Sequence, residues 1–201
     1  MKSLAISLEK KRSQIVKESD NELILKFLNG DEDSFFIIVE RYKDKITNYI
    51  YRIVKDYEVS IDLSQETFLR IYEYLPNYKF DYKFSTLIYK IASNLAIDHL
   101  RREGKLLNEE KINFKNIKLN NQLNPEEELL KEELLKKIEK EIMNLPLVYR
   151  EPFILKEIEN LDISQISKIL GCKRGTVKSR LFRARAILKE KLSPYMGVKN
   201  V

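Results

Sequence analysis

Hydrophobic residues recur every three or four positions along most of the chain, which is the pattern of amphipathic helices. The longest stripe runs through residues 35–53. Four helices are predicted in the first half of the chain. The first is opened by Asp20 and stopped by Gly30, and the second runs through residues 35–53. The third is opened by Asp62 and ended by Pro76, and the fourth is capped by Ser85 and ends with Arg101 and Arg102. These elements predict a helical first domain.

The helical periodicity disappears over residues 104–123, where Asn, Lys and Glu dominate and no face collects enough apolar residues to pack. It resumes at Asn124, a capping residue followed by Pro125 at the first helical position, and Pro152 should later kink or restart a helix. We therefore predict an all-α fold of two small helical domains. The expected order is an N-terminal extension (1–19), the first domain (20–103), a flexible linker (104–123), the second domain (124–194) and a tail (195–201).

The second domain ends in the layout of a helix-turn-helix. Asp162 and Gln165 form a capping-box-like pair that opens a short helix, Gly171 lies at the tight turn, and a second helix begins near Arg174. The apolar residues that share the buried side of this second helix are Val177, Leu181, Ala184 and Leu188. The opposite side presents Gly175, Thr176, Ser179, Phe182 and Arg183, flanked by Lys178 and Arg180.

That outer side suits the major groove of DNA, because small residues let a helix approach and Arg can bond two acceptors of a guanine. Charge supports this interpretation. Residues 173–191 hold eight basic residues and one acidic residue, a net charge of +7, whereas the whole chain has a net charge of +6, so the basic excess is concentrated on this helix. A solvated basic helix packed by its apolar seam is the alternative. The cap, the turn and the two-sided helix favour nucleic-acid binding.

Composition narrows the functional classes. A single Cys excludes an intramolecular disulfide and fits a reducing cytoplasm. One His and one Cys cannot build a His/Cys zinc site, and we expect no metal, no cofactor and no catalysis by this chain alone. The longest apolar run, residues 35–39, is far too short to insert into a membrane, and the first residues lack the apolar segment of a secretory signal. A cytoplasmic protein is expected.

Two further patches lie in the first domain. Asp62, Gln65, Glu66 and Leu69 share one helix face, which is either ordinary surface or a protein-docking site. The second patch alternates aromatic residues with charged ones over a predicted loop: Tyr78, Phe80, Tyr82 and Phe84. These rings can plug the edge of a core, or they can offer flat faces to unstacked bases of single-stranded DNA.

The order of these parts resembles a bacterial RNA polymerase sigma factor of the small, two-domain extracytoplasmic-function (ECF) type. The residues that carry the resemblance are DLSQETFLR at 62–70, FSTLIYKIASNLAIDHLRR at 84–102, LPLVYREP at 145–152, and ISKILGCKRGTVKSRLFRAR at 166–185. It covers residues 20–102 and 125–192. A specificity subunit that directs promoter-specific initiation through core RNA polymerase is the implied function.

The resemblance also implies partners and site residues. Core polymerase would be contacted at its largest-subunit clamp and its flap, with Asp62, Gln65, Glu66 and Leu69 on the clamp. The minus-ten element would be captured by Asn77, Tyr78, Phe80, Tyr82, Phe84, Asn94, Arg101 and Arg102, with a base flipped from its stack. The minus-thirty-five element would be read by Arg174, Thr176, Lys178, Ser179, Arg180, Phe182 and Arg183. An anti-sigma protein, common in the family, is a further partner that the resemblance allows.

The chain departs from the family pattern at two positions. It has no tryptophan, and Leu87 stands where members commonly carry one near the start of the melting helix. Arg174 replaces the usual proline before the glycine of the recognition helix, which adds a cation for phosphate. Two other classes compete: an operator-binding regulator that binds duplex DNA unaided as a dimer, and a DNA-acting enzyme with a helix-turn-helix tail, which no isolated carboxylate set supports.

Overall fold

The computed structural model describes residues 18–105 and 127–195, with side chains in the second range from residue 134 onward. These ranges are helical and contain no strand, which confirms the all-α class. The chain divides into a first unit (1–99 with 168–170) and a second unit (100–167 with 171–201). Most of the predicted extension and linker, and the predicted cap at Asn124, lie outside the described residues.

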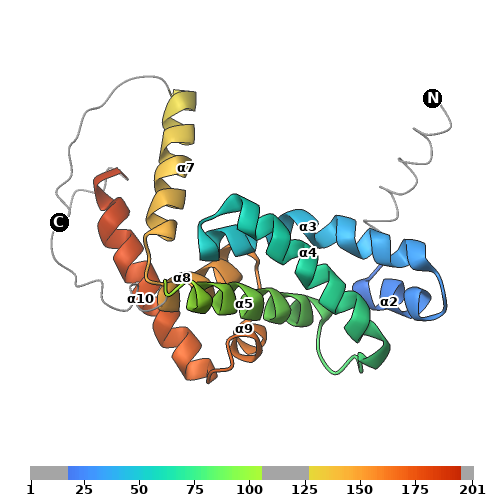
Figure 1. Cartoon of the computed structure of the whole chain (residues 1–201). Helices are drawn as coiled ribbons and strands as arrows, with labels where there is room; N and C mark the ends of the chain where they lie inside the picture. The colour runs from blue at the N-terminus through green and yellow to red at the C-terminus, as the bar shows by residue number, and fades with distance from the viewer. Residues whose placement is uncertain (1–17, 106–126, 196–201) are drawn as a thin grey trace, which may run out of the picture. The chain divides into compact units, whose positions relative to one another are not determined.

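The first unit is built around one long central helix. Its elements are α2 (Asp20–Leu28), α3 (Glu32–Val54), α4 (Tyr57–Tyr74), a short 3₁₀ turn η1 (Leu75–Asn77) and α5 (Phe84–Arg102). Helices α2 and α4 pack along α3 (Figure 1), and α5 meets α3 through an edge-to-face contact of Tyr89 with Tyr49, ring centroids 5.2 Å apart. Isoleucines dominate the fully buried core, for example Ile38, Ile46 and Ile71.

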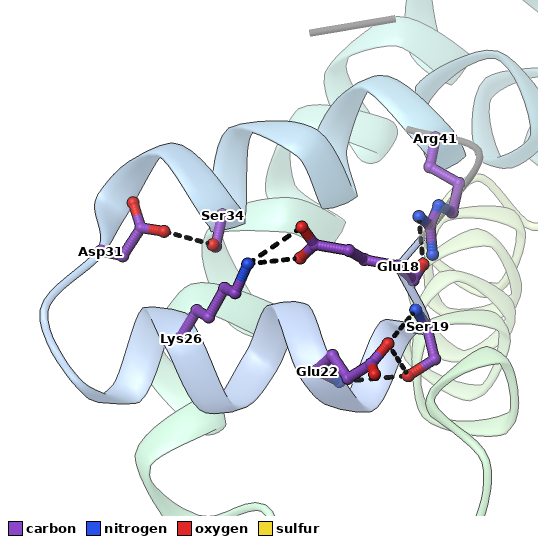
Figure 2. Close-up of polar contacts among 7 residues, drawn as sticks. All are labelled: Glu18, Ser19, Glu22, Lys26, Asp31, Ser34 and Arg41. Atoms are coloured by element: carbon purple, nitrogen blue, oxygen red, sulfur yellow. Dashed lines mark hydrogen bonds and ion pairs between the residues drawn. The ribbon is translucent and has the colours of Figure 1, made fainter. Parts of the chain in front are cut away.

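Helix α2 is capped by Ser19 rather than by Asp20, the predicted cap. Ser19 and Glu22 form a capping box in which the Ser19 amide donates to the Glu22 carboxylate at 2.7 Å and the Glu22 amide donates to the Ser19 hydroxyl at 3.3 Å. Figure 2 shows this pair at the start of the helix, beside the Lys26–Glu18 ion pair at 2.8 Å. Asp20 is the first helical residue, and its carboxylate binds Arg41 and the Tyr42 hydroxyl of α3 instead.

Two other helix starts also differ from the prediction. Helix α4 begins at Tyr57, where the Asp56 side chain accepts the Val59 amide at 3.1 Å, so Asp62 lies inside the helix. The buried Ser60 donates its hydroxyl to the Asp56 carbonyl, which lets a polar first turn pack inward. Ser85 is likewise not a cap, because α5 already begins at Phe84. In both cases the helix begins before the predicted residue, at Tyr57 and at Phe84.

The second unit ends in the helix-turn-helix. Its elements are α7 (Glu127–Met143), α8 (Leu147–Phe153), a π-helical segment η2 (Ile154–Ile158), α9 (Ile163–Ile169), α10 (Arg174–Leu192) and a 3₁₀ turn η3 (Ser193–Tyr195). Helix α10 packs on α8 and α7. Pro152 lies within α8, and the wider π-helical turn follows it directly, as expected when a residue without an amide hydrogen interrupts the hydrogen-bond ladder.

Arg150 joins the first two helices of this unit. Its side chain is fully buried, and its guanidinium donates to the backbone carbonyls of Met143 and Leu145 at 2.7 and 3.1 Å. Carbonyls at the C-terminal end of a helix have no hydrogen-bond partner within the helix. A buried cation there donates hydrogen bonds to them and interacts favourably with the negative end of the helix dipole. Arg150 therefore fixes the end of α7 against α8, which supports α10.

Candidate nucleic-acid interface

The helix-turn-helix has the local geometry that its sequence predicts. The Gln165 amide donates to the Asp162 carboxylate at 2.8 Å, and the Asp162 amide donates to the Gln165 side chain at 3.2 Å, which closes the capping box of α9. Gly171 takes a φ of +60° at the turn, a conformation that costs glycine no steric strain. Helix α10 then starts at Arg174, as predicted.

Helix α10 buries one side and exposes the other. Val177, Leu181, Ala184 and Leu188 are all buried, which confirms the predicted seam. On the outer side Lys178, Ser179 and Arg183 are exposed, and the Phe182 side chain is 74% exposed. Thr176 and Arg180 are only half-buried, at the border between the two sides. An aromatic ring this open costs free energy in water, so a surface that covers Phe182 would be favoured.

Three arginines of α10 are held by residues that precede the helix. Arg174 donates to the Ser164 hydroxyl at 2.7 Å, and Arg183 donates to the Tyr149 hydroxyl at 3.3 Å. Arg185 pairs with Glu157 at 2.5 Å. Sequence reasoning missed Tyr149 and Glu157, because the partners are separated by 34 and 28 residues and no local pattern links them.

The aromatic loop, residues 78–84, divides into buried and accessible rings. The side chains of Tyr78 and Phe84 are 5% and 1% exposed, so both plug the edge of the first unit. Phe80 and Tyr82 are half-buried, whereas Asn77 is exposed. Burial raises the pKa of Tyr78 to about 12 and raises the pKa of Tyr42 as well, where the Asp20 carboxylate adds to the effect.

Helix α5 supplies the other residues predicted to meet the minus-ten element. Asn94, Arg101 and Arg102 are exposed on it. Leu87, which stands at the family's tryptophan position, is buried and offers no ring to a base. The accessible aromatic surface near the start of α5 therefore comes from the loop that precedes it.

The α4 face predicted for protein docking is open. Asp62 and Gln65 are exposed, and the Leu69 side chain is 61% exposed. Glu66 accepts a hydrogen bond from Arg70 at 2.8 Å in an i,i+4 ion pair. Helical spacing brings the predicted residues to one face, where an exposed leucine is flanked by carboxylates.

Within the parts that the structure describes, no helix is long and apolar enough to cross a membrane. No group of three or more His, Cys, Asp or Glu side chains among the described residues is arranged to hold a metal ion.

Comparison with protein families matches both units. Residues 38–106 match the family model described as Sigma-70 region 2, and residues 135–188 match the one described as Sigma-70, region 4. The chain is 35% identical over 170 residues to the ECF RNA polymerase sigma factor SigW of Bacillus subtilis (strain 168), covering 81% of this chain and 91% of that relative. It is 32% identical over 183 residues to the ECF RNA polymerase sigma-E factor of Escherichia coli (strain K12), covering 88% and 95%.

Solved structures share the fold. CnrH in complex with the cytosolic domain of CnrY has a TM-score of 0.65 at 20% identity, covering 88% of this chain and 99% of that chain. The sigma factor RpoE from Bartonella quintana, in complex with the anti-sigma factor NepR, has a TM-score of 0.61 at 19% identity, covering 79% and 96%.

Proposed function

Because this chain belongs to the ECF group of the sigma-70 family, it is a transcription initiation factor that directs core RNA polymerase to promoters, and we propose which of its residues do so. The proposed domains are residues 20–103, which dock on polymerase and handle the minus-ten element, and residues 124–194, which read the minus-thirty-five element. Residues 104–123 would link them.

Core polymerase would dock on the α4 face. Asp62, Gln65 and Glu66 would meet a basic surface of the largest-subunit clamp, and Leu69 would be buried there. The exposure of Asp62, Gln65 and Leu69 supports the assignment, and the half-buried Glu66 lies beside them in its pair with Arg70. Since charge complementarity mainly sets association rate and specificity, the exposed leucine is expected to supply much of the affinity. The second unit would contact the polymerase flap.

The minus-ten strand would lie along the loop and α5. Phe80 and Tyr82 would stack against unpaired bases, Asn77 and Asn94 would bond base edges or the backbone, and Arg101 and Arg102 would meet phosphates. A base that leaves the duplex stack loses stacking energy, so accessible rings favour melting. Tyr78 and Phe84 belong to the same set, and their burial favours a role inside the loop.

The minus-thirty-five element would be read by the outer side of α10. Arg183, Lys178 and Ser179 would face base edges, and Phe182 would meet a thymine methyl group. The remaining residues of the proposed set, Arg174, Thr176 and Arg180, lie at the start or border of this side and suit phosphate contacts. The two-sided burial of α10 supports this orientation.

The cellular setting is also part of the proposal. We place the protein in the cytoplasm, as a specificity subunit without catalysis of its own. An anti-sigma protein is proposed as a partner, because one structural neighbour is described in complex with an anti-sigma factor and another in complex with the cytosolic domain of a second protein.

The observation that carries the residue assignment is the combination, in one chain, of an open acidic α4 face, an aromatic loop and an exposed DNA-reading side of α10. In vitro transcription on a promoter fragment library tests it. The chain with core polymerase should give discrete start sites, whereas neither component alone should. Binding to duplex promoter without polymerase, at affinity equal to that with polymerase, would indicate an operator-binding regulator instead.

A further inference from the structure

Tyr78 is the centre of the aromatic loop. Its ring lies 4.7 Å from Phe80, 5.9 Å from Tyr82 and 6.4 Å from Phe84 between centroids. Its hydroxyl donates to the backbone carbonyl of Tyr82, which ties the two sides of the loop together. With its ring in contact with three others and buried, Tyr78 cannot offer a stacking face to a base unless the loop comes apart.

The centre of the loop is anchored on the first helices of the chain. Phe84 packs edge-to-face on Tyr42 with centroids 5.5 Å apart. The Tyr42 hydroxyl donates to the Asp20 carboxylate at 2.7 Å, and the same carboxylate accepts from Arg41. A series of contacts therefore runs from the half-buried Asp20 at the start of α2, through the buried Tyr42 of α3 and Phe84, to the loop.

The loop holds one residue in a backbone conformation that the sequence alone would not favour. Phe80 has a φ of +57°, the left-handed region in which a bulky side chain is strained. Such a conformation persists only when surrounding contacts enforce it, and here the contact is the Tyr78 ring. The result is that Phe80 and Tyr82 stay half-exposed around a buried support.

We propose that Tyr42 and Tyr78 are positioning residues that hold the aromatic loop from inside, so that Phe80 and Tyr82 are presented to the single-stranded minus-ten DNA. This assignment rests on the proposed function and gives the four aromatic residues of the loop two different roles. Phe80 and Tyr82 touch bases, while Tyr78 and Phe84 shape the loop.

A double-mutant cycle tests the proposal. The full chain is assembled with core polymerase, and the probe is a fluorescein-labelled single-stranded oligonucleotide carrying the minus-ten sequence of a promoter that the wild-type holoenzyme selects from a random library. Binding is measured by anisotropy for Phe80→Leu, Tyr78→Leu, Tyr42→Leu and the double variant of Phe80 and Tyr78. Tyr57→Leu, an exposed tyrosine of α4 away from the loop, is the matched control.

Phe80→Leu and Tyr78→Leu should each weaken binding by about tenfold, the loss of one stacked base, and Tyr42→Leu should weaken it in the same direction. The double variant should bind no more weakly than Tyr78→Leu, because loss of the support already removes the Phe80 contact. Tyr57→Leu should bind as wild type does. The proposal is overturned if the fold-loss of affinity in the double variant equals the product of the two single fold-losses. It is also overturned if Tyr78→Leu binds the oligonucleotide as tightly as wild type does.

Folding is separated from positioning by a conservative change. If Tyr78→Leu no longer binds core polymerase, Tyr78→Phe decides, since it keeps the ring and loses only the hydroxyl bond to Tyr82. It should weaken oligonucleotide binding by about threefold, and unchanged binding overturns the proposal. Failure of the wild-type holoenzyme to select any promoter overturns the proposed function and this inference together, whereas the outcomes above overturn the inference alone.

Discussion

Replacing Asp20 by Asn tests the contact that fastens α2 to α3. The Asp20 carboxylate accepts from Arg41 Nη1 at 2.5 Å and from the Tyr42 hydroxyl at 2.7 Å, and the Asp20 and Arg41 side chains are only 23% and 17% exposed. An amide keeps one acceptor oxygen but turns its NH₂ group toward the other donor. Arg41 would retain its bond to the Glu18 carbonyl at 2.7 Å.

The magnitude follows from these contacts. A hydrogen bond to a charged group contributes about 1.5–3 kcal/mol, and a buried donor that loses its acceptor costs about 1–3 kcal/mol. Because water reaches part of the Asp20 side chain and relieves some of that cost, we expect Asp20→Asn to lower the free energy of unfolding of the first unit by about 2–3 kcal/mol.

Urea unfolding followed by the near-ultraviolet circular dichroism of the tyrosines measures the change. With a slope of about 1–2 kcal/mol per molar urea for a unit of this size, the midpoint should fall by about 1–3 M. Glu40→Gln is the control, because Glu40 pairs with Lys43 at 2.8 Å across one turn of the same helix, with side chains 30% and 46% exposed, and does not join two helices. It should change stability by less than about 0.5 kcal/mol. Equal effects of the two substitutions would refute the argument that the bonds of Asp20 to α3 carry this stability.

Three further predictions concern the proposed interfaces and the buried tyrosines. Arg183→Ala should weaken binding of the holoenzyme to its minus-thirty-five element by about 1–3 kcal/mol and relax the preference at one base, measured with a panel of single-base promoter variants; unchanged promoter choice would mean that another residue reads that base. Glu66→Lys should reduce co-purification with core polymerase, whereas Glu73→Lys, at an exposed position near the end of α4, should not; equal retention by both would remove Glu66 from the docking face. Because the pKa of Tyr78 is raised on folding, its contribution to stability should be complete below pH 10, where the unfolded phenol stays protonated, and should decline as pH rises from 10 toward 12. Tyr78→Phe should flatten this decline, measured as urea midpoints across that pH range. An unaltered slope would show that other groups cause the decline.

The sequence by itself determined the elements whose signals are local. The helix-turn-helix is the clearest case, because the Asp162–Gln165 capping pair, the turn at Gly171 and the buried seam of α10 each depend on residues a few positions apart. The open α4 face was predictable for the same reason. The start of α4 was not, because its first turn buries Ser60, a polar residue that ordinary patterning assigns to the surface.

Tertiary structure alone decided which side chains of the loop are open to a partner and which are buried behind them. The sequence did not distinguish the four aromatic residues of the loop from one another. Packing against α3 buries Tyr78 and Phe84 and leaves Phe80 and Tyr82 half-exposed. The bonds of Asp20 to α3 and of Arg183 to Tyr149 join residues more than twenty positions apart. Capping preferences and helical periodicity relate residues only a few positions apart. These long-range bonds could therefore be identified only from the packing of one helix on another.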